Sequence, residues 1–409
     1  MIKLNRLILL ILLFFINTHS KAQVNKSYFN WTSHPNCIIT LDSLIKNCSK
    51  YGLIATDYNR KILSPYLHIN PLIQSVNSKT DSLIQLTALH FFSDLAYGNR
   101  IPLFGYKRLN YKFDFNGVNI LLQHYANTNT LIKLVAKFNN ASIEIITLLK
   151  EINKTGTPLT NKKRKILIQA LNDYRWLNEV IKNNKLILVN IPSTHLTYYE
   201  NGKSTLDMKV IVGKHLTPTV SLFSKLNQIV VNPYWNVPRS IMVREMLPHL
   251  KSDPGYIDRN HLQLLDLNYK TLNPYKINWE NIDTVKFPYY IRQSTGCDNS
   301  LGVVKLDFDN PFGIYIHDTP EKSLFTLQSR FYSHGCIRME KPVAMAKLLL
   351  KNNRQALDSI DFENCYKNPS PINIQITEIV NVVIWYNLID FDQQGNIRYY
   401  SDIYNKYNY

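Results

Sequence analysis

The feature that most constrains the fold is a change in hydrophobic pattern near Lys185. Before this point, apolar residues recur at helical spacing. After it, short runs of β-branched and aromatic residues are bounded by turn residues. A chain of 409 residues is also too long for one ordinary domain. We therefore predict an α+β protein, with a helical N-terminal scaffold domain followed by a β-rich domain.

The helical part divides into a scaffold domain, residues 23–110, and a helical connecting region, residues 111–183. Asp81 opens a segment with apolar residues close to a 3.6-residue period, and Gly98 ends it as a C-terminal helix glycine would. Residues 154–158 contain the breaker Thr-Gly-Thr-Pro. The basic run that follows predicts the solvated face of another helix.

The β-rich part is predicted to cover residues 184–365. Its clearest element is a hairpin around the turn Asn201-Gly202. Residues 239–286 lose the strand pattern and predict an inserted subdomain, with a helix that stops at Pro248 and loop beyond it. Residues 366–409 predict closing strands.

The first 22 residues predict a secretory signal peptide. Lys3 and Arg6 precede the apolar run 7–16, and small residues follow at the spacing of a cleavage site. The run is shorter than the roughly 20 apolar residues that span a bilayer, although an uncleaved anchor is the alternative. No later stretch predicts a membrane span, so we expect none in the mature chain.

The net charge indicates the kind of partner. The chain carries +17, and cleavage after residue 22 would remove three basic residues and no acidic one, which leaves +14. An exported protein rarely meets nucleic acid, so we expect no nucleic-acid partner. An anionic polymer of the cell envelope fits the charge better.

Five cysteines remain after such a cleavage, an odd number. In an oxidising compartment this leaves at least one thiol free, unless it pairs between chains. Cys37 and Cys48 either pair with each other or stay reduced in helices. Cys297, in a loop next to Gly296, is more simply an incidental thiol than a redox group; the remaining two are Cys336 and Cys365.

The densest cluster of reactive residues is Ser333-His334-Gly335-Cys336-Ile337-Arg338. A cysteine attacks a carbonyl as a thiolate, and a histidine can accept its proton. A glycine before it lets the backbone turn tightly, so that N–H groups can face an oxyanion. Upstream, Tyr315 and His317 share one face of a predicted strand, whose end could reach the cysteine.

Two other interpretations compete for these residues. His317, His334 and Cys336 could form a three-ligand metal site, but no metal-binding spacing supports it. Alternatively, Cys336 could be held in a structural disulfide, which would remove the nucleophile.

The combination of His317 with Ser333-His334-Gly335-Cys336 resembles the signature of L,D-transpeptidases of the YkuD type. The resemblance to the long, YcbB-like branch of that family runs from about residue 175 to residue 404. It is carried by ILVNIP (187–192), VIVG (210–213), NPYWNVP (232–238), DPGY (253–256) and HDTP (317–320), with DLAYG (94–98) similar to the N-terminal scaffold of that branch.

The resemblance implies a reaction and a set of site residues. Cys336 would attack the third residue of a donor tetrapeptide stem, and a thioester acyl-enzyme would then react with an acceptor amine to give a 3→3 link. No metal or other cofactor is implied. His317 would be the base beside an ionised sulfur, His334 would polarise that sulfur or the oxyanion, and the N–H groups of Cys336 and Gly335 would form the oxyanion hole. Candidate substrate-binding residues are Arg338, Ser333, Tyr315, Tyr234 and Trp235.

The resemblance also implies a setting and leaves alternatives. The expected location is the periplasm, in association with the cell wall, and the expected partners are peptidoglycan stem peptides. Residues 239–286 would form a mobile cap over the donor stem. Residues 111–183 contain no clear peptidoglycan-binding module, in contrast to long members of the family. An L,D-carboxypeptidase and a non-catalytic wall-binding scaffold remain alternatives, and the acceptor and oligomeric state stay open.

Overall fold

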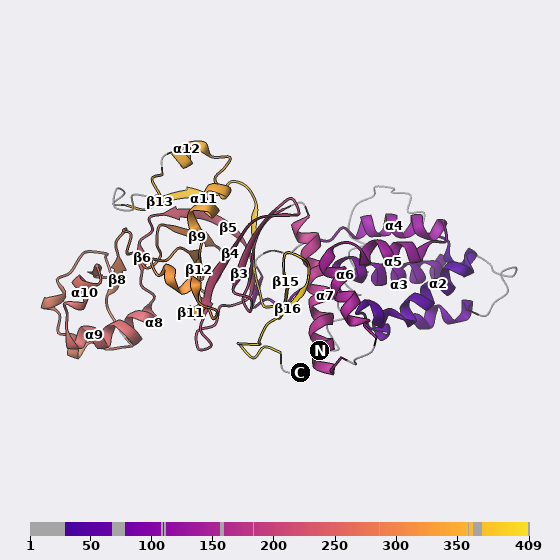
Figure 1. Cartoon of the computed structure of the whole chain (residues 1–409), viewed down its shortest axis with the longest axis horizontal. Helices are drawn as coiled ribbons and strands as arrows, with labels where there is room; N and C mark the ends of the chain where they lie inside the picture. Colours follow the sequence, from indigo (N-terminus) through magenta and orange to yellow (C-terminus); the bar gives the residue numbers. More distant parts are fainter. Residues whose placement is uncertain are drawn as a thin grey trace.

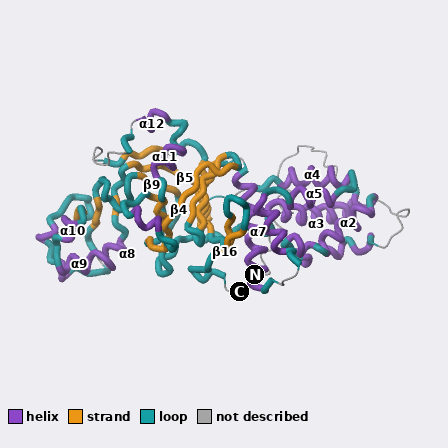
Figure 2. Tube along the Cα trace, viewed as in Figure 1, coloured by secondary structure: helices purple, strands orange, loops and turns teal. Residues whose placement is uncertain are grey.

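The chain has three parts in a row, with a closed β-sheet between a helical region and a small inserted subdomain (Figures 1 and 2). The computed structural model describes residues 29–67, 78–107, 109, 112–155, 159–182, 184–285, 287–358, 360–362 and 370–407. The predicted α+β fold is confirmed. The predicted signal peptide lies outside the described residues, as does Cys365.

The helical region is built from long helices and short 3-10 turns. Buried apolar side chains from α2 to α5 form one core that reaches Val135, well past the expected boundary at residue 110. The helices are α2 (Pro35–Lys46), α3 (Ser78–Tyr97), α4 (Phe115–Asn127), α5 (Leu131–Asn139), α6 (Ile143–Ile152) and α7 (Asn161–Ile181). The 3-10 turns are η1 (Trp31–Ser33), η2 (Cys48–Tyr51), η3 (Ala55–Asp57), η4 (Arg60–Ile62) and η5 (Ser64–Tyr66).

Gly98 ends α3, as the sequence predicts. Its φ of +80° lies in the left-handed region, where a glycine is tolerated best. A Cβ at this position would lie 2.5 Å from the carbonyl oxygen of Asn172 in α7. The glycine therefore both stops the helix and lets α3 approach α7 closely.

The central sheet runs in the order β1-β5-β14-β2-β3-β4-β12-β10-β9, and it closes because β9 also pairs with β5. Its interior is filled by buried aliphatic side chains, covered at one end by α11. The strands are β1 (Tyr106–Lys107), β2 (Lys185–Asn190), β3 (His195–Glu200), β4 (Lys203–Gly213), β5 (Leu222–Val231), β9 (Val304–Phe308), β10 (Ile316–His317), β11 (Phe331–Ser333), β12 (Ile337–Met339), β13 (Ile372–Gln375) and β14 (Val380–Trp385). The remaining elements here are η10 (Lys322–Thr326), α11 (Pro342–Leu349), α12 (Arg354–Asp358), β15 (Ile389–Phe391) and β16 (Ile397–Tyr399).

The C-terminal strands are integral to this sheet. β14 lies between β2, with which it pairs in parallel, and β5, with which it pairs antiparallel. β13 pairs antiparallel with β5. Residues beyond 366 therefore complete the sheet that the hairpin β3–β4 begins.

The inserted subdomain has its own three-stranded sheet, in the order β6-β8-β7, and its own apolar core. The prediction of loop after residue 248 is wrong. Pro248 lies in the helix Leu247–Ser252, which continues directly from the π-helix Met242–Met246, so the proline does not end the helical segment. The elements are β6 (Trp235–Asn236), α8 (Arg239–Ile241), the π-helix η7 (Met242–Met246), α9 (Leu247–Ser252), α10 (Tyr256–Arg259), β7 (Leu262–Leu265), η8 (Pro274–Lys276), η9 (Trp279–Asn281) and β8 (Tyr290–Gln293).

The described cysteines comprise free thiols and one disulfide-bonded residue. Cys37 and Cys48 are buried free thiols in the helical region, so they do not pair with each other. Cys297 is disulfide-bonded, so the expectation of an incidental thiol is wrong. Cys336 is free. Within the described ranges, no helix is both long enough and apolar enough to cross a membrane.

A buried polar contact lies where the helical region meets the sheet. Helices α6 and α7 pack their apolar faces on the outer face of strands β2, β5 and β14. In this interface, the side-chain amide of Asn387 donates to the Asp173 carboxyl at 3.3 Å, and Asp173 is 3% exposed. Burial raises the pKa of Asp173 to about 7, although Arg100 and Gln169 act in the opposite direction.

We expect this carboxyl to make stability depend on pH. Because its pKa is higher in the folded than in the unfolded chain, its stabilising contribution is full below about pH 3.9 and is lost as pH rises through about 7. Relative to Asp173→Asn, the wild type should lose on the order of 2 kcal/mol of unfolding free energy between pH 5 and pH 8. Urea unfolding of both proteins at the two pH values measures this. A difference that stays constant with pH would contradict it.

Candidate active site

Strand pairing brings the two principal site residues together. Cys336 lies in the turn between β11 and β12, two strands that Figure 1 labels, and His317 ends β10. β10 and β12 are parallel neighbours, with Ile316 opposite Ile337. The Ile337 N–H donates to the Tyr315 carbonyl at 3.0 Å, which fixes this register. His317 therefore lies opposite Arg338, and Cys336 lies in the turn that immediately precedes the neighbouring strand.

The Cys336 thiol is surrounded by polar groups but is protonated at rest. Its sulfur lies 3.7 Å from the Gly313 carbonyl oxygen and accepts hydrogen bonds from the backbone N–H and the hydroxyl of Tyr315. Burial raises the pKa of the thiol above its ordinary value, although Tyr315, Lys305 and Arg338 oppose this. The expectation of an ionised sulfur is therefore wrong for the free protein.

His317 is a buried, neutral imidazole. Its pKa is lowered to about 3, first by burial and then by the positive charges of Arg338 and Lys305. Its ring lies 5.4 Å from that of Tyr315, measured between centroids. The Nδ1 atom is buried and has no hydrogen-bond partner within the described part of the chain. Since buried polar atoms are normally paired, this nitrogen is available to bind or to accept a proton.

Ser333 and Gly335 shape the turn that presents the thiol. The Ser333 hydroxyl donates to the Cys336 carbonyl at 2.5 Å and accepts from the Gly335 N–H at 3.1 Å. The Gly335 N–H is thus already used, so the expectation that it contributes to an oxyanion hole is wrong. Ser333 is occupied by the turn rather than exposed to a ligand. Gly335 has a φ of +116°, a conformation that side-chain-bearing residues rarely adopt.

The turn also contacts the inserted subdomain. His334 Nε2 lies 2.7 Å from a carboxylate oxygen of Glu245 in η7, so this ring nitrogen is paired with the inserted subdomain. The sequence predicts that His334 polarises the sulfur or the oxyanion. The hydroxyl of Tyr315, which contacts the Cys336 sulfur, is also hydrogen-bonded by the side chain of Trp235 in β6. Two contacts therefore join the inserted subdomain directly to the residues around the thiol.

The other predicted binding residues have partners of their own. Arg338 forms an ion pair with Glu321. The guanidinium of Arg292, in β8 of the inserted subdomain, lies 4.4 Å from the centre of the Tyr234 ring and makes a cation–π contact with it. Arg338 is nevertheless close enough to Cys336 and His317 to lower the pKa of both.

Sequence reasoning missed three contributors to the site. Lys305 stacks over Tyr315, with its Nζ 4.5 Å from the ring centre, and lowers the pKa of Cys336 and His317. Glu245 binds His334. Thr219 donates to the Gly335 carbonyl at 2.9 Å. Lys305 alternates with apolar Val304 and Leu306 in β9, and this alternation indicates an outward-facing lysine but not what it faces.

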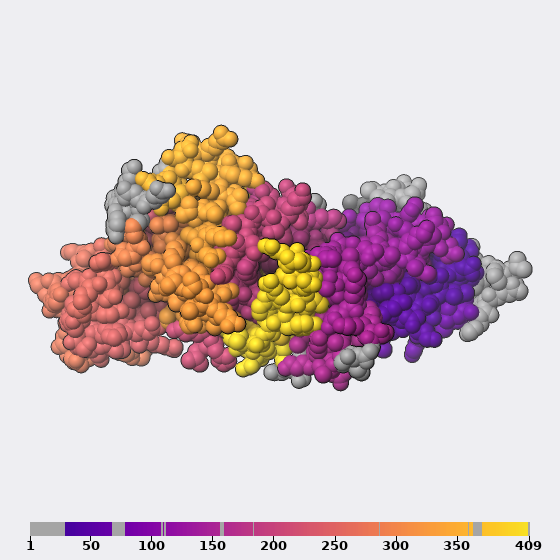
Figure 3. Space-filling view, in the orientation of Figure 1, coloured from indigo at the N-terminus to yellow at the C-terminus, as the bar shows by residue number. Residues whose placement is uncertain are grey.

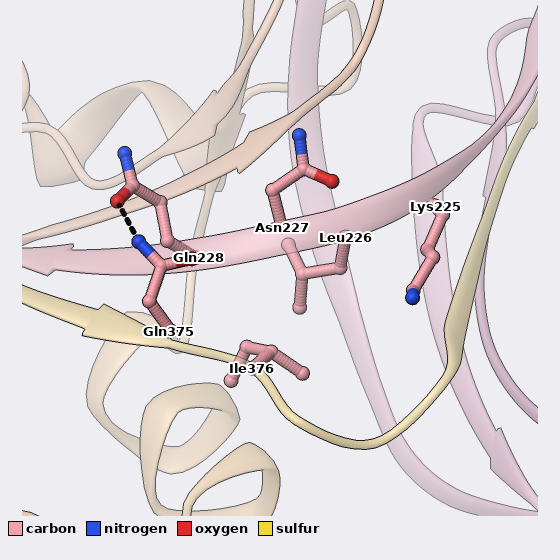
Figure 4. Close-up of a pocket in the computed structure, with 6 residues that line it drawn as sticks. All are labelled: Lys225, Leu226, Asn227, Gln228, Gln375 and Ile376. Atoms are coloured by element: carbon pink, nitrogen blue, oxygen red, sulfur yellow. Dashed lines mark hydrogen bonds between the residues drawn. The ribbon is translucent and has the colours of Figure 1, made fainter.

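No metal site is apparent among the residues described. No three or more His, Cys, Asp or Glu side chains gather there in a way that could hold an ion. A hollow of about 470 Å³ lies elsewhere, along β5 and β13, and Figure 4 shows its polar lining. Its residues are Lys225, Leu226, Asn227, Gln228, Gln375 and Ile376, none of which belongs to the site above.

The protonation states predict how Cys336 reacts with an alkylating agent. Because its pKa is raised, we expect the rate of alkylation by iodoacetamide to rise continuously from pH 6 to pH 9, without a plateau. Peptide mass spectrometry of Cys336 at each pH gives the rate, and the buried Cys37 and Cys48 should label far more slowly. A plateau below pH 7 would instead reveal a preformed thiolate–imidazolium pair.

Comparison with known proteins identifies this region. Residues 184–357 match the family model described as the L,D-transpeptidase catalytic domain, YkuD. A curated Haemophilus influenzae protein named "Putative L,D-transpeptidase" is 38% identical over 245 residues, which are 60% of this chain and 49% of that protein. This chain thus spans about half the length of that relative.

Solved structures give weaker similarity. The catalytic domain of an Enterococcus faecium L,D-transpeptidase is 14% identical, with a TM-score of 0.22 over 50% of this chain and 98% of that one. An L,D-transpeptidase from Mycobacterium smegmatis is 13% identical, with a TM-score of 0.20 over 49% of this chain and 58% of that one. Scores of this size carry no conclusion, so the assignment depends on the sequence matches. These matches show that residues 184–357 are similar in sequence to the L,D-transpeptidase catalytic domain, YkuD.

Proposed function

We propose that this protein is a peptidoglycan L,D-transpeptidase that forms 3→3 cross-links through a thioester on Cys336. The observation that carries the proposal is the free thiol of Cys336 in the turn before β12, the strand that pairs with the strand ending at His317, together with a His317 Nδ1 that has no partner among the described residues. A neutral imidazole is in the protonation state that a general base needs. The match of residues 184–357 to the YkuD family supports the same chemistry.

In the acylation step, the Cys336 sulfur attacks the carbonyl carbon of the third residue of a donor tetrapeptide stem. His317 takes the thiol proton as the C–S bond forms. The carbonyl oxygen becomes an oxyanion, and the Cys336 N–H, which has no intramolecular acceptor among the described residues, is its donor. The C–N bond to the terminal D-alanine then breaks, and His317 returns the proton to the departing amine.

In the transfer step, an amine of an acceptor stem attacks the thioester. His317 removes a proton from this amine, a new amide C–N bond forms, and the C–S bond breaks. The sulfur leaves as a thiolate and recovers its proton from His317. The thiol and the neutral imidazole are regenerated, so the cycle needs no outside oxidant or reductant.

The charges around the thiol favour an anionic stem peptide. Lys305 and Arg338 both act electrostatically on Cys336, and carboxylates of the stem would be attracted to them. In this proposal, Tyr315 and Trp235, which are hydrogen-bonded to each other, border the bound stem together with Tyr234. In this proposal, residues 239–286 act as a mobile cap, held over the site by His334 and Glu245.

The setting follows from the proposed reaction. The protein would be exported by a signal peptide at residues 1–22, and it would act in the periplasm on the cell wall. Carbapenems, which acylate enzymes of this family, would acylate Cys336. The acceptor could be a stem peptide, a lipoprotein or a free D-amino acid, and the assay below is designed around the first.

Incubation of the purified protein with tetrapeptide muropeptides tests the reaction. We expect mass spectrometry to detect 3→3 dimers with the wild type and none with Cys336→Ala. His317→Ala should stay folded, yet lose acylation by at least about 100-fold, because it lacks the general base. Cys37→Ala is the matched control, since this second free thiol lies in the helical core and should not affect turnover.

Each alternative function has its own outcome in this assay. Tripeptide products without dimers would show an L,D-carboxypeptidase, in which water resolves the thioester. Dimers formed by Cys336→Ala would overturn the nucleophile assignment. If neither muropeptides nor a carbapenem left an adduct on Cys336, the wall-binding scaffold would be favoured.

A further inference from the structure

A buried threonine lies directly behind the nucleophile turn. The loop from β4 to β5 folds back on itself at Gly213, where a Cβ would lie 2.1 Å from the carbonyl oxygen of Thr217. This brings the fully buried hydroxyl of Thr219 to the Gly335 carbonyl, to which it donates at 2.9 Å. The same hydroxyl accepts from the Gly213 N–H at 2.9 Å, so both of its hydrogen-bonding roles are used.

This hydrogen bond fixes the direction of the Cys336 N–H. The Gly335 carbonyl and the Cys336 N–H belong to one planar trans peptide, so they point in opposite directions. By holding the carbonyl on the side of the β4–β5 loop, Thr219 directs the N–H away from that loop. The constraint matters here because Gly335, at a φ of +116°, has little conformational preference of its own.

A second layer holds Thr219 in place. The hydroxyl of Tyr404 donates to the Gly213 carbonyl at 2.5 Å and accepts from the Thr219 N–H at 3.3 Å. Tyr404 stacks on Tyr386, with ring centroids 5.5 Å apart. Figure 3 shows the C-terminal residues, in yellow, lying over the junction of the sheet with the helical region. Tyr404 of the C-terminal segment thus stabilises the β4–β5 loop, and Thr219 of that loop stabilises the turn that holds Cys336.

We propose that Thr219 is a positioning residue that aims the Cys336 N–H at the oxyanion formed during acylation. The inference rests on the proposed function, because it presumes an attack on a carbonyl by Cys336. It assigns to Thr219 a role that none of the predicted site residues has. Its signature is specific, because a misdirected N–H slows reactions that form an oxyanion and leaves other reactions of the same sulfur unchanged.

The test compares two reactions of Cys336 in Thr219→Val, which keeps the side-chain shape but lacks the hydroxyl. We expect the rate of acylation by a carbapenem, followed by intact-protein mass spectrometry, to fall by about 10- to 100-fold. Alkylation by iodoacetamide, which passes through no oxyanion, should change by less than about threefold. Thr219→Ser, which keeps the hydroxyl, should restore most of the acylation rate.

Thr217→Val is the matched control from the same loop. Its hydroxyl donates to the Ser333 carbonyl at 3.0 Å, but that carbonyl also accepts from the Lys214 N–H, so acylation should stay near wild type. If thermal melting shows that the Thr219→Val protein is unfolded, the same comparison is made with Thr219→Ala. Unchanged acylation without the Thr219 hydroxyl, or an equal loss of acylation and alkylation, would overturn the inference. A wild type that is never acylated would instead overturn the proposed function.

Discussion

The parallel pairing of β10 with β12 is the contact on which the site depends. It is only two residues long in β10, yet it sets Ile316 opposite Ile337 and so brings the end of one strand next to the turn that opens the other. The closed sheet keeps both strands in place, because β12 also pairs with β4 on its other side and β10 also pairs with β9. Closure of the sheet therefore fixes how the turn that holds Cys336 lies relative to the strand that ends at His317.

Burial gives this pair an uncharged resting state. It raises the pKa of Cys336 and lowers that of His317, and in each case it opposes the charged form. A protonated thiol is a poor nucleophile and also a poor target for oxidation. In the proposed mechanism, the reactive form is made as the thiol proton moves to the imidazole during attack on a carbonyl.

Much of this architecture was predictable from local patterns. Period and turn residues located α3, the hairpin β3–β4 and most strands, and the clustering of His317 with residues 333–338 located the site. Patterns of neighbours could not show which backbone groups were already paired. The Gly335 N–H donates to the Ser333 hydroxyl, and the Glu245 carboxylate pairs with His334. Both contacts form only in the folded chain. The short strand β7 and the helix through Pro248 were also missed, because each depends on the packing of the small inserted core.

The place of β14 in the sheet has a consequence for how the protein matures. This strand comes from residues 380–385, yet it fills the gap between β2, which is 195 residues earlier in the chain, and β5, which is about 160 residues earlier. Until it arrives, two apolar strand edges have no neighbour, and such edges invite pairing with other chains. The sheet therefore cannot close around its apolar interior until residues 380–385 have joined it.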